Sequence, residues 1–587
     1  MSHISKLFQD HKVQIKNKSG FDLAHSNFLT QKCGQLTPVC TIPMLPNDSI
    51  SLGFMSQIKL PPMATSFYGR VDYRLEAFFV PYRILWGGWE NFYTQPIADP
   101  YGTTVERPHF LPNYIGAHST AVSEIFRRGS LADYLGIKGF AANAVADSPF
   151  DMVSNMLPFF AYHKIYDDWY RNANIQKPAF VRKTAFVDGD SCGSLPFYPS
   201  AVTISDVTTL QKGNNGADID IIVDDNLLGD ASANTPLSSI QFGNTYTGKV
   251  RFSTQLADGF SLFSLRQRNW AKDYFTTATL YPQQSGTTAG AGIKSALDAA
   301  DDSHPDGSTT FSISQIRQAN ILQKWLERNN IAGSRYADQI RATFGVLPSD
   351  AMLDRPIFLG GSSFGIYTNS IAQTANSVKG SAMANPYSGQ AGADSGQTSG
   401  FGKDSLIDKF TASEHGLIMV IGSIVPHATY STGTSRMFAM SQFGDIPNPM
   451  FEGLGQESIL KAELAPYQSH LGHDNEVFGY VDQYAWMKYM NDEVHGLLVD
   501  GESLDSFALQ RSFDSNSAKL DSSFIQIPLD FLDQVLAVKQ EKSGFSSWAN
   551  FYFDVKKTSL LSQYTIPTLG EPKNTHTETV PNTGRSL

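Results

Sequence analysis

The stretch RVDYRLEAFFVPYRILWGGWENF, residues 70–92, decides the fold class of this chain. Apolar and charged side chains alternate over residues 71–76, and over residues 77–80 both alternating faces are apolar. A period of two is the pattern of a β-strand, so we expect a strand that begins half-exposed, ends covered on both faces and stops at Pro81. Three aromatic residues then recur every three positions and predict a short helical turn or a compact aromatic loop: Trp86, Trp89 and Phe92.

Further strand patterns lie near both ends of the chain, with long gaps between them. Residues 415–426 are apolar on both faces, and residues 550–557 alternate. Weaker strand candidates are residues 37–45, 49–60 and 249–256. The strands do not alternate regularly with helices, which argues against a doubly wound parallel sheet. An antiparallel sandwich with long connections fits the pattern better.

Helical patterns are few. The clearest covers residues 313–329, where Ile313, Ile316, Ile321 and Trp325 contribute to an apolar stripe. Two shorter helices are predicted at residues 159–171 and 335–344, and Gly345 is expected just past the end of the latter.

The composition is that of a large protein with few charges. Of 587 residues, 41% are hydrophobic, 12% aromatic and 17% charged. This length exceeds one ordinary compact core, so several modules or one core with large insertions are expected. The net charge is −11, so any contact with nucleic acid requires a local basic patch. Three cysteines make no disulfide framework and are expected to be buried thiols in a reducing cell: Cys33, Cys40 and Cys192.

Export and membrane signals are missing from the sequence. The N-terminal residues hold no apolar core of a signal peptide, and the longest apolar run, residues 416–425, is far shorter than the ~20 residues of a membrane span. We therefore expect a soluble protein made in the cytoplasm.

Catalytic and metal-binding motifs are weak. Residues 361–365 match G-x-S-x-G with Ser363 as a nucleophile, but no helical pattern follows, so a structural turn is the preferred interpretation. The segment HLGHD, residues 470–474, offers His470, His473 and Asp474 without a fourth ligand. The acidic residues 218–226 lack the order of an EF-hand loop. We expect no catalytic residue, no cofactor and no metal.

Two basic clusters are candidates for contact with single-stranded nucleic acid. The first lies in the N-terminal arm, and the second lies beside Trp270, Tyr274 and Phe275, whose rings could stack on bases. The alternative for both is an ordinary solvated or packing cluster. The candidate residues are Lys6, Lys12, Lys16, Lys18, Arg266, Arg268 and Lys272.

Several longer strings together resemble a known family. The opening stretch is similar to the signature F-F-V-P-x-R-x-x-W-x-x-W-E-x-F of the major capsid protein of the Microviridae, the small single-stranded DNA bacteriophages. Further matches follow in the same order, among them LERN and GSRY within residues 321–361, RPIFLGG at their end, and residues 158–176, 265–283, 414–426 and 478–496. The gokushovirus-like branch is the most similar.

The resemblance implies a mainly β fold, an eight-stranded antiparallel viral jelly roll (a β-sandwich) with long loop insertions and a few short helices. It implies a T=1 icosahedral shell of identical subunits around a circular single-stranded DNA genome, and no enzymatic activity. The partners it implies are other copies of the chain, the packaged DNA, small DNA-packaging and pilot proteins and a receptor on the host surface. The expected location is the virion, assembled in the bacterial cytoplasm. Candidate subunit-packing residues are Trp86, Trp89, Phe92 and Trp325.

The same resemblance organises the chain into a basic N-terminal arm (1–20) inside the shell, one jelly-roll domain (21–570) and a polar tail (571–587). The expected insertions are residues 186–248, 285–310, 376–404 and a helical insertion at 312–345. Residues 186–248 carry eight aspartates and one lysine, so packaged DNA would repel them at short range. We expect this segment on the outer surface, as a candidate protrusion.

Two other classes of function stay open at this stage. A β-sandwich hydrolase would use Ser363 with one of four histidines, His415, His427, His470 or His473. A carbohydrate-binding sandwich would use exposed tryptophan and tyrosine side chains in its loops.

Overall fold

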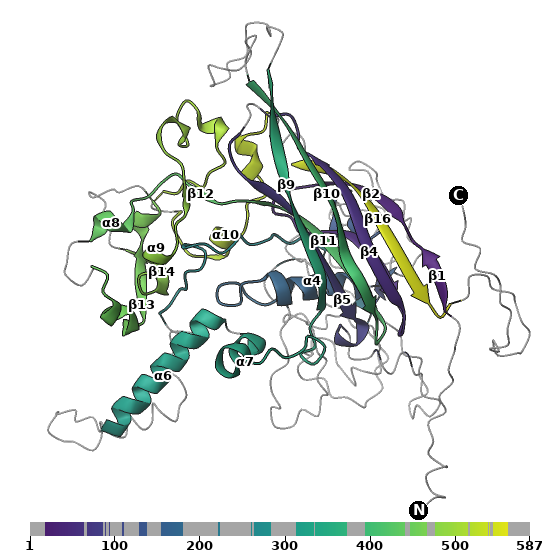
Figure 1. The fold of residues 1–587 in the computed structure, drawn as a ribbon, viewed down its shortest axis with the longest axis horizontal. Helices are drawn as coiled ribbons and strands as arrows, with labels where there is room; N and C mark the ends of the chain where they lie inside the picture. The colour runs from purple at the N-terminus through teal and green to yellow at the C-terminus, as the bar shows by residue number, and fades with distance from the viewer. Residues whose placement is uncertain are drawn as a thin grey trace, which may run out of the picture.

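The structure is a computed structural model of the chain, and Figure 1 shows its ribbon. It describes residues 18–63, 67–85, 89, 93, 109–110, 128–137, 154–155, 157–179, 221–222, 260, 263–282, 313–333, 335–372, 394–440, 446–465, 476–514, 517–537, 539 and 544–561. The expected strand at 249–256 lies outside these residues, as do the tail at 571–587, the insertion at 285–310 and nearly all of residues 186–248.

Nine strands form one antiparallel sheet in the order β1-β16-β4-β10-β9-β5-β11-β3, and β2 pairs with β16 beside β1. Their bounds are β1 Ser19–Asp22, β2 His25–Gln31, β3 Thr37–Met44, β4 Ser49–Lys59, β5 Val71–Pro81, β9 Ile357–Ala372, β10 Asp394–Thr411, β11 Gly416–Pro426 and β16 Ser547–Ser559. The strands expected around residues 37–45, 49–60, 70–80, 415–426 and 550–557 are therefore confirmed.

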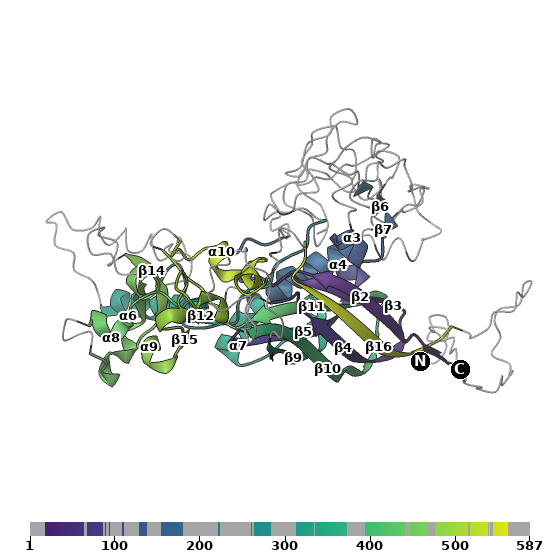
Figure 2. The ribbon, with the colours of Figure 1, turned by 90° about the horizontal axis from the view of Figure 1, so that it is seen from above.

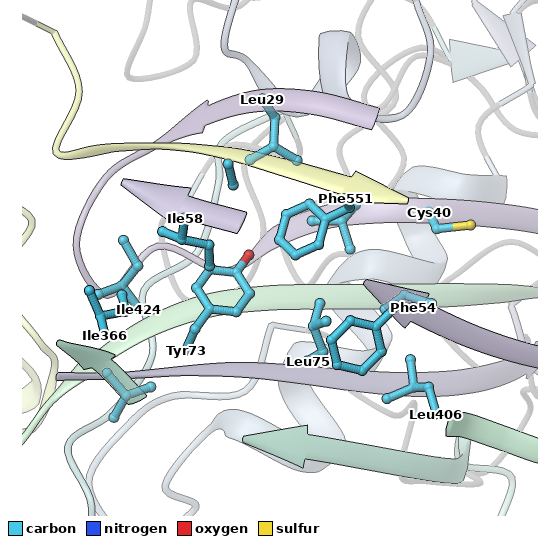
Figure 3. Close-up of a cluster of buried hydrophobic side chains, with 14 of the residues drawn as sticks. Leu29, Cys40, Phe54, Ile58, Tyr73, Leu75, Ile366, Leu406, Ile424 and Phe551 are labelled. Atoms are coloured by element: carbon cyan, nitrogen blue, oxygen red, sulfur yellow. The ribbon is translucent and has the colours of Figure 1, made fainter. Parts of the chain in front are cut away.

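The sheet folds over to make a sandwich of two halves, β2-β16-β4-β10 and β9-β5-β11-β3, joined by the pairing of β9 with β10. Side chains of both halves meet in one core: the ring of Tyr73 on β5 lies 5.5 Å from that of Phe551 on β16, and its hydroxyl donates to Gln31 on β2 at 3.1 Å. Figure 3 shows these rings between the strands, with Ile58 and Leu75 beside them. The eight principal strands have the jelly-roll order, which confirms the expected fold class.

The opening stretch forms β5, and Pro81 is its last residue. Arg74 and Glu76 are half-buried, as the alternation predicts, but Asp72 is buried because it lies 3.0 Å from His427 Nε2 and also accepts from Arg70. The start of the strand is thus less exposed than expected, because two basic side chains satisfy the carboxylate.

The second half of β5 is covered by the α4 region. Helix α4, Leu157–Ile165, continues as a π-helical turn over Tyr166–Tyr170. The ring of Trp169 in this turn lies 5.6 Å from that of Phe78 on β5. The full burial predicted for the end of the strand is therefore achieved within one subunit.

The prediction of a turn at residues 360–365 is wrong, because these residues lie within β9. A Cβ atom at Gly360 would lie 2.1 Å from the carbonyl oxygen of Leu406 on β10. The glycine is therefore needed because the two strands approach closely here. Glycine serves both this purpose and turns, so the local sequence of a strand can resemble that of a turn. Likewise, residues 394–404 of the expected insertion at 376–404 belong to β10.

The expected helices are confirmed, including α6 and α7 of the helical insertion. Gly345 ends α7 in the left-handed conformation, with φ of 69°. Within the described residues the α-helices are α3 Leu131–Tyr134, α4, α6 Ile313–Ala332, α7 Tyr336–Phe344, α8 Arg436–Ala439, α9 Ala485–Lys488 and α10 Ser522–Ile525. Single 3-10 turns cover Tyr82–Ile84, Pro449–Leu454, Lys461–Glu463, Gly496–Leu498, Asp505–Phe507 and Phe531–Gln534.

A second lobe lies beside one end of the sandwich, as Figure 2 shows. Its small core includes Tyr274, Phe275, Tyr430, Phe478 and Phe524, each of which makes at least one edge-to-face ring contact with another. Short strands pair within this lobe: β12 Thr429–Tyr430 with β15 Asp492–Glu493, and β13 Gln456–Leu460 with β14 Val477–Asp482. In a separate small sheet, β6 His109–Phe110 pairs with β7 Ser154–Asn155 and with β8 Ile221–Ile222.

Candidate functional site

The basic and aromatic segment around residue 270 lies inside the subunit. Trp270, Tyr274 and Phe275 are all buried, so their rings are not exposed for stacking on bases. Residues 263–282 run between the sandwich and the second lobe and bond to both: the backbone N–H of Arg268 donates to the Gly34 carbonyl between β2 and β3, and Thr279 exchanges backbone bonds with Tyr480 on β14. This segment therefore joins the two cores.

Arg268 makes a two-pronged ion pair with Glu76 on β5. Its guanidinium donates to the two carboxylate oxygens at 2.7 and 3.0 Å and to Ser423 Oγ at 3.0 Å, and the Tyr170 hydroxyl also donates to Glu76. Burial raises the pKa of Glu76, but the attraction of Arg268 and these hydrogen bonds outweigh it and hold the pKa below its ordinary value. The charge on Arg268 is thus used within the fold.

Arg266 is also committed to intrachain contacts, with 1% of its surface exposed. Its Nε donates to His163 Nδ1 at 3.0 Å, and its guanidinium lies 4.7 Å from the ring centre of Tyr166 and 4.5 Å from that of Phe260. Two aromatic faces and a histidine thus hold a buried arginine, a cation–π arrangement that stabilises the fold locally.

The other predicted DNA-contact residues are exposed or lie outside the described residues. Lys272 is exposed, and so is Lys18, whose Nζ donates to the backbone carbonyl and the side-chain oxygen of Asn47, both at 2.8 Å. Lys6, Lys12 and Lys16 precede the first described residue. DNA contact at the whole set stays a prediction.

The aromatic end of the opening stretch packs against the start of β11. The ring of Trp89 lies 4.8 Å from that of Tyr82 and 5.7 Å from that of His415, and Tyr93 lies 4.4 Å from His415. Burial lowers the pKa of His415 in this cluster. Trp86 and Phe92 lie outside the described residues. Subunit contact at Trp86, Trp89 and Phe92 therefore stays a prediction.

The apolar stripe expected along 313–329 faces largely outward. Ile321 is 70% exposed and Trp325 is 47% exposed, whereas Leu326 and Asn330 hold the helix against the subunit. Asn330 Nδ2 donates to Thr279 Oγ1 at 2.9 Å. Trp325, a predicted subunit-packing residue, is therefore available to a partner.

Ser363 does not have the setting of a catalytic serine. It lies within β9, opposite Arg74 of β5, rather than on a strand-to-helix turn. No hydrogen bond to a histidine is found for it among the described residues; His427 instead contacts Asp72, and His470 and His473 are outside those residues.

Cys40 and His25 form a close cysteine–histidine pair, with 3.9 Å between Sγ and Nε2. Burial raises the pKa of the Cys40 thiol to about 12, so the thiolate needed for nucleophilic attack is scarce at neutral pH. Cys33 is likewise a buried free thiol, as expected, and Cys192 lies outside the described residues.

The described part of the chain holds neither a cluster of metal-ligating side chains nor a helix suited to a bilayer. Its His, Cys, Asp and Glu side chains form no group of three or more with the spacing of a metal site. No helix there has both the length and the apolar character required to cross a bilayer.

Sequence reasoning missed an exposed surface of the second lobe. Met487 and Met490 on and after α9 are exposed, and the exposed carboxylates of Asp492 and Glu493 follow within six residues in the sequence. We call these four residues the acidic methionine patch. The string MKYMNDE, residues 487–493, carries the composition in plain view, but only the structure shows that its methionines face outward.

Comparisons with known proteins agree along almost the whole chain. A family model described as capsid protein (F protein) matches residues 11–198 and 268–569. The capsid protein VP1 of Bdellovibrio phage phiMH2K is 24% identical over 568 residues, covering 94% of this chain and 95% of the relative. That of Chlamydia phage 1 is 25% identical over 607 residues (94% and 96%), and that of Spiroplasma virus 4 is 23% identical over 592 residues (94% and 95%).

Proposed function

The chain belongs to the capsid protein (F protein) family, and on this premise we propose that it forms a T=1 icosahedral shell of identical subunits around a circular single-stranded DNA genome. Family membership makes it a structural protein of the virion that assembles into a shell of many subunits. The observation that carries the proposal is the family match over both ends of the chain, together with the jelly-roll strand order. The shell symmetry and the nature of the genome are the proposed part.

We assign contact with the genome to exposed lysines rather than to the two arginines that are paired within the fold. Arg266 and Arg268 hold the fold together through His163 and Glu76. Lys272 and Lys18 are exposed, and the preceding arm adds Lys6, Lys12 and Lys16. Lysines neutralise phosphates without reading the base sequence, which suits a coat that packages one genome by charge.

The remaining proposed partners are the host surface and the other proteins of the virion. The acidic segment 186–248, with eight aspartates, is placed on the outside, where it can meet the host surface without repulsion from packaged DNA. Small DNA-packaging proteins and a pilot protein complete the virion. Assembly takes place in the cytoplasm of the host bacterium.

Particle formation tests the proposal directly. The chain should be expressed with and without its phage genome, and particles purified on a density gradient. Electron microscopy should show isometric shells of sixty subunits, the number that T=1 symmetry requires, and nuclease-treated particles should release circular single-stranded DNA. Subunits that stay monomeric under all assembly conditions, or shells that protect only double-stranded DNA, would refute it.

The arm is tested by replacing Lys12, Lys16 and Lys18 with glutamine. Protected DNA per particle should fall, because the arm loses three cationic contacts, while shells still form. A matched control replaces three exposed lysines elsewhere, Lys403, Lys409 and Lys519. An equal loss of DNA in the control would show that total charge, rather than the arm, is responsible.

A further inference from the structure

The outward face of α6 combines large apolar side chains with basic ones. Helix α6 packs on the subunit through Leu326 and Asn330. With 3.6 residues per turn, six residues project from the opposite side. We call them the α6 face: Arg317, Ile321, Lys324, Trp325, Arg328 and Ile331. Figure 1 shows α6 extending away from the sheet.

The apolar part of the α6 face is unusual for a helix on a soluble subunit. Ile331 is 57% exposed, in addition to Ile321 and Trp325. A surface helix normally turns its apolar stripe to the core and its charges to water. Exposed apolar groups of this size, mixed with cations, are typical of a surface that a protein partner covers.

The basic part of the α6 face lacks acidic partners. Arg317, Lys324 and Arg328 are exposed and make no ion pair with any other described residue. The one acidic residue of the helix, Glu327, accepts from Gln323 at 2.8 Å. The face therefore presents an uncompensated positive charge.

The acidic methionine patch has the opposite charge and a matching apolar character. Asp492 and Glu493 are exposed within six residues of the exposed Met487 and Met490, Glu493 lies 3.2 Å from His495 Nε2, and the exposed Asp482 ends β14 nearby in sequence. The only lysine of residues 482–502 is Lys488, which pairs with Glu452 at 2.8 Å. Methionine side chains are flexible and adapt to the shape of a partner surface.

We propose that the α6 face of one subunit binds the acidic methionine patch of a neighbouring copy. The inference rests on the proposed shell function and names one of its contacts. Two different surfaces of the same chain make a head-to-tail contact, which closes into a ring around a rotation axis, as shell symmetry requires. Charge complementarity orients the contact, and Trp325 and the isoleucines supply its apolar centre. Nucleic acid is the less suitable occupant, because isoleucines do not stack on bases.

Charge exchange tests the contact. Lys324→Glu with Arg328→Glu should lower the yield of assembled particles by about tenfold or more, since two acidic surfaces then face each other. Asp492→Lys with Glu493→Lys should do the same. A chain with all four changes restores opposite charges at every copy of the contact, so its yield should return to within about twofold of the unaltered chain. Lys519→Glu, an exposed charge reversal elsewhere, is the control and should assemble normally.

The outcomes separate this contact from the shell function. Normal particles from the Lys324→Glu, Arg328→Glu chain would overturn the contact alone. The same holds if the chain with all four changes fails to assemble although its circular dichroism spectrum matches that of the unaltered subunit. Shells that form normally but lose DNA would assign the α6 face to nucleic acid and also overturn the contact. Absence of particles from the unaltered chain would overturn the proposed function and the contact together.

Cross-linking gives a second measurement that does not depend on charge-reversed variants. Particles carrying Trp325→Cys and Met490→Cys are treated with a short bismaleimide, with Cys192 replaced by serine. Linked subunits should appear on a denaturing gel only when both new cysteines are present, because Cys33 and Cys40 are buried. Only unlinked chains, or links within one chain, would refute the contact.

Discussion

Arg268→Met should destabilise the folded subunit by about 3–5 kcal/mol, because it leaves the largely buried carboxylate of Glu76 without the cation that pairs with it. The side chains of Arg268 and Glu76 are 11% and 21% exposed, and the guanidinium supplies both carboxylate oxygens with hydrogen bonds. Among the described residues, the Tyr170 hydroxyl is then the one remaining donor to Glu76. A loss of this size is a large fraction of the ~5–15 kcal/mol that stabilises a typical domain.

The measurement is urea unfolding of the subunit below its assembly concentration, with tryptophan fluorescence as the signal that reports unfolding. The control is Lys556→Met, whose ion pair with Asp554 spans 3.9 Å between side chains that are 72% and 52% exposed, so a change of about 0.5 kcal/mol or less is expected. Adding Glu76→Gln to Arg268→Met removes the buried charge that was left behind. The double variant should therefore recover much of the loss.

The effect should also depend on pH. The pKa of Glu76 is lowered in the folded subunit, so the stability it contributes is present above its unfolded pKa and is lost as pH falls through the lower folded pKa. The difference between the unaltered chain and Arg268→Met should thus be largest near neutral pH and shrink below about pH 4. A cost no greater than that of the control, or one independent of pH, would refute this account of the ion pair.

Gly360→Ala should lower the free energy of unfolding by about 1–3 kcal/mol, and with it the urea midpoint, because the new Cβ would lie 2.1 Å from a carbonyl oxygen of β10. Gly453→Ala, with no atom within 4 Å, is its control, and equal midpoints would contradict the packing argument. Tyr73→Phe should cost about 1 kcal/mol in the same assay through the lost hydrogen bond across the sandwich, and no loss would count against that bond. Cys40 should react with iodoacetamide slowly in the native subunit and rapidly in urea, since burial raises its pKa to about 12; rapid native labelling, detected by peptide mass spectrometry, would contradict its burial.

The strands that could be found from the sequence are those whose side chains alternate or are uniformly apolar, such as β5 and β11. The strands β9 and β10 were missed because they contain glycine and serine where a strand usually carries large side chains. Gly360 is required by a backbone on β10 that is 46 positions away in sequence. Such a requirement leaves no local pattern, so a turn was the natural but wrong expectation.

For the candidate sites, the sequence likewise shows which residue types are present but not which way their side chains point. The basic and aromatic composition of the segment containing Arg266, Arg268 and Trp270 was visible, but the inward direction of these side chains was not. A guanidinium beside an aromatic ring suits nucleic acid binding and suits a buried cation–π contact equally well. The choice depends on His163 and Glu76, which come from other parts of the chain.

The sequence by itself determined the secondary structure of the patterned segments, the absence of a strong catalytic motif and, through its ordered motifs, the capsid family. Periodicity carries this information because it records local backbone geometry and which side chains share a face. Tertiary structure alone decided the setting of each face: the π-helical turn over the end of β5, the acidic partner of Arg268, and the exposure of the apolar side chains of α6 on the subunit. Burial depends on segments distant in sequence, so a local pattern can show that a face is apolar but not whether its partner lies in the same subunit or in the next one.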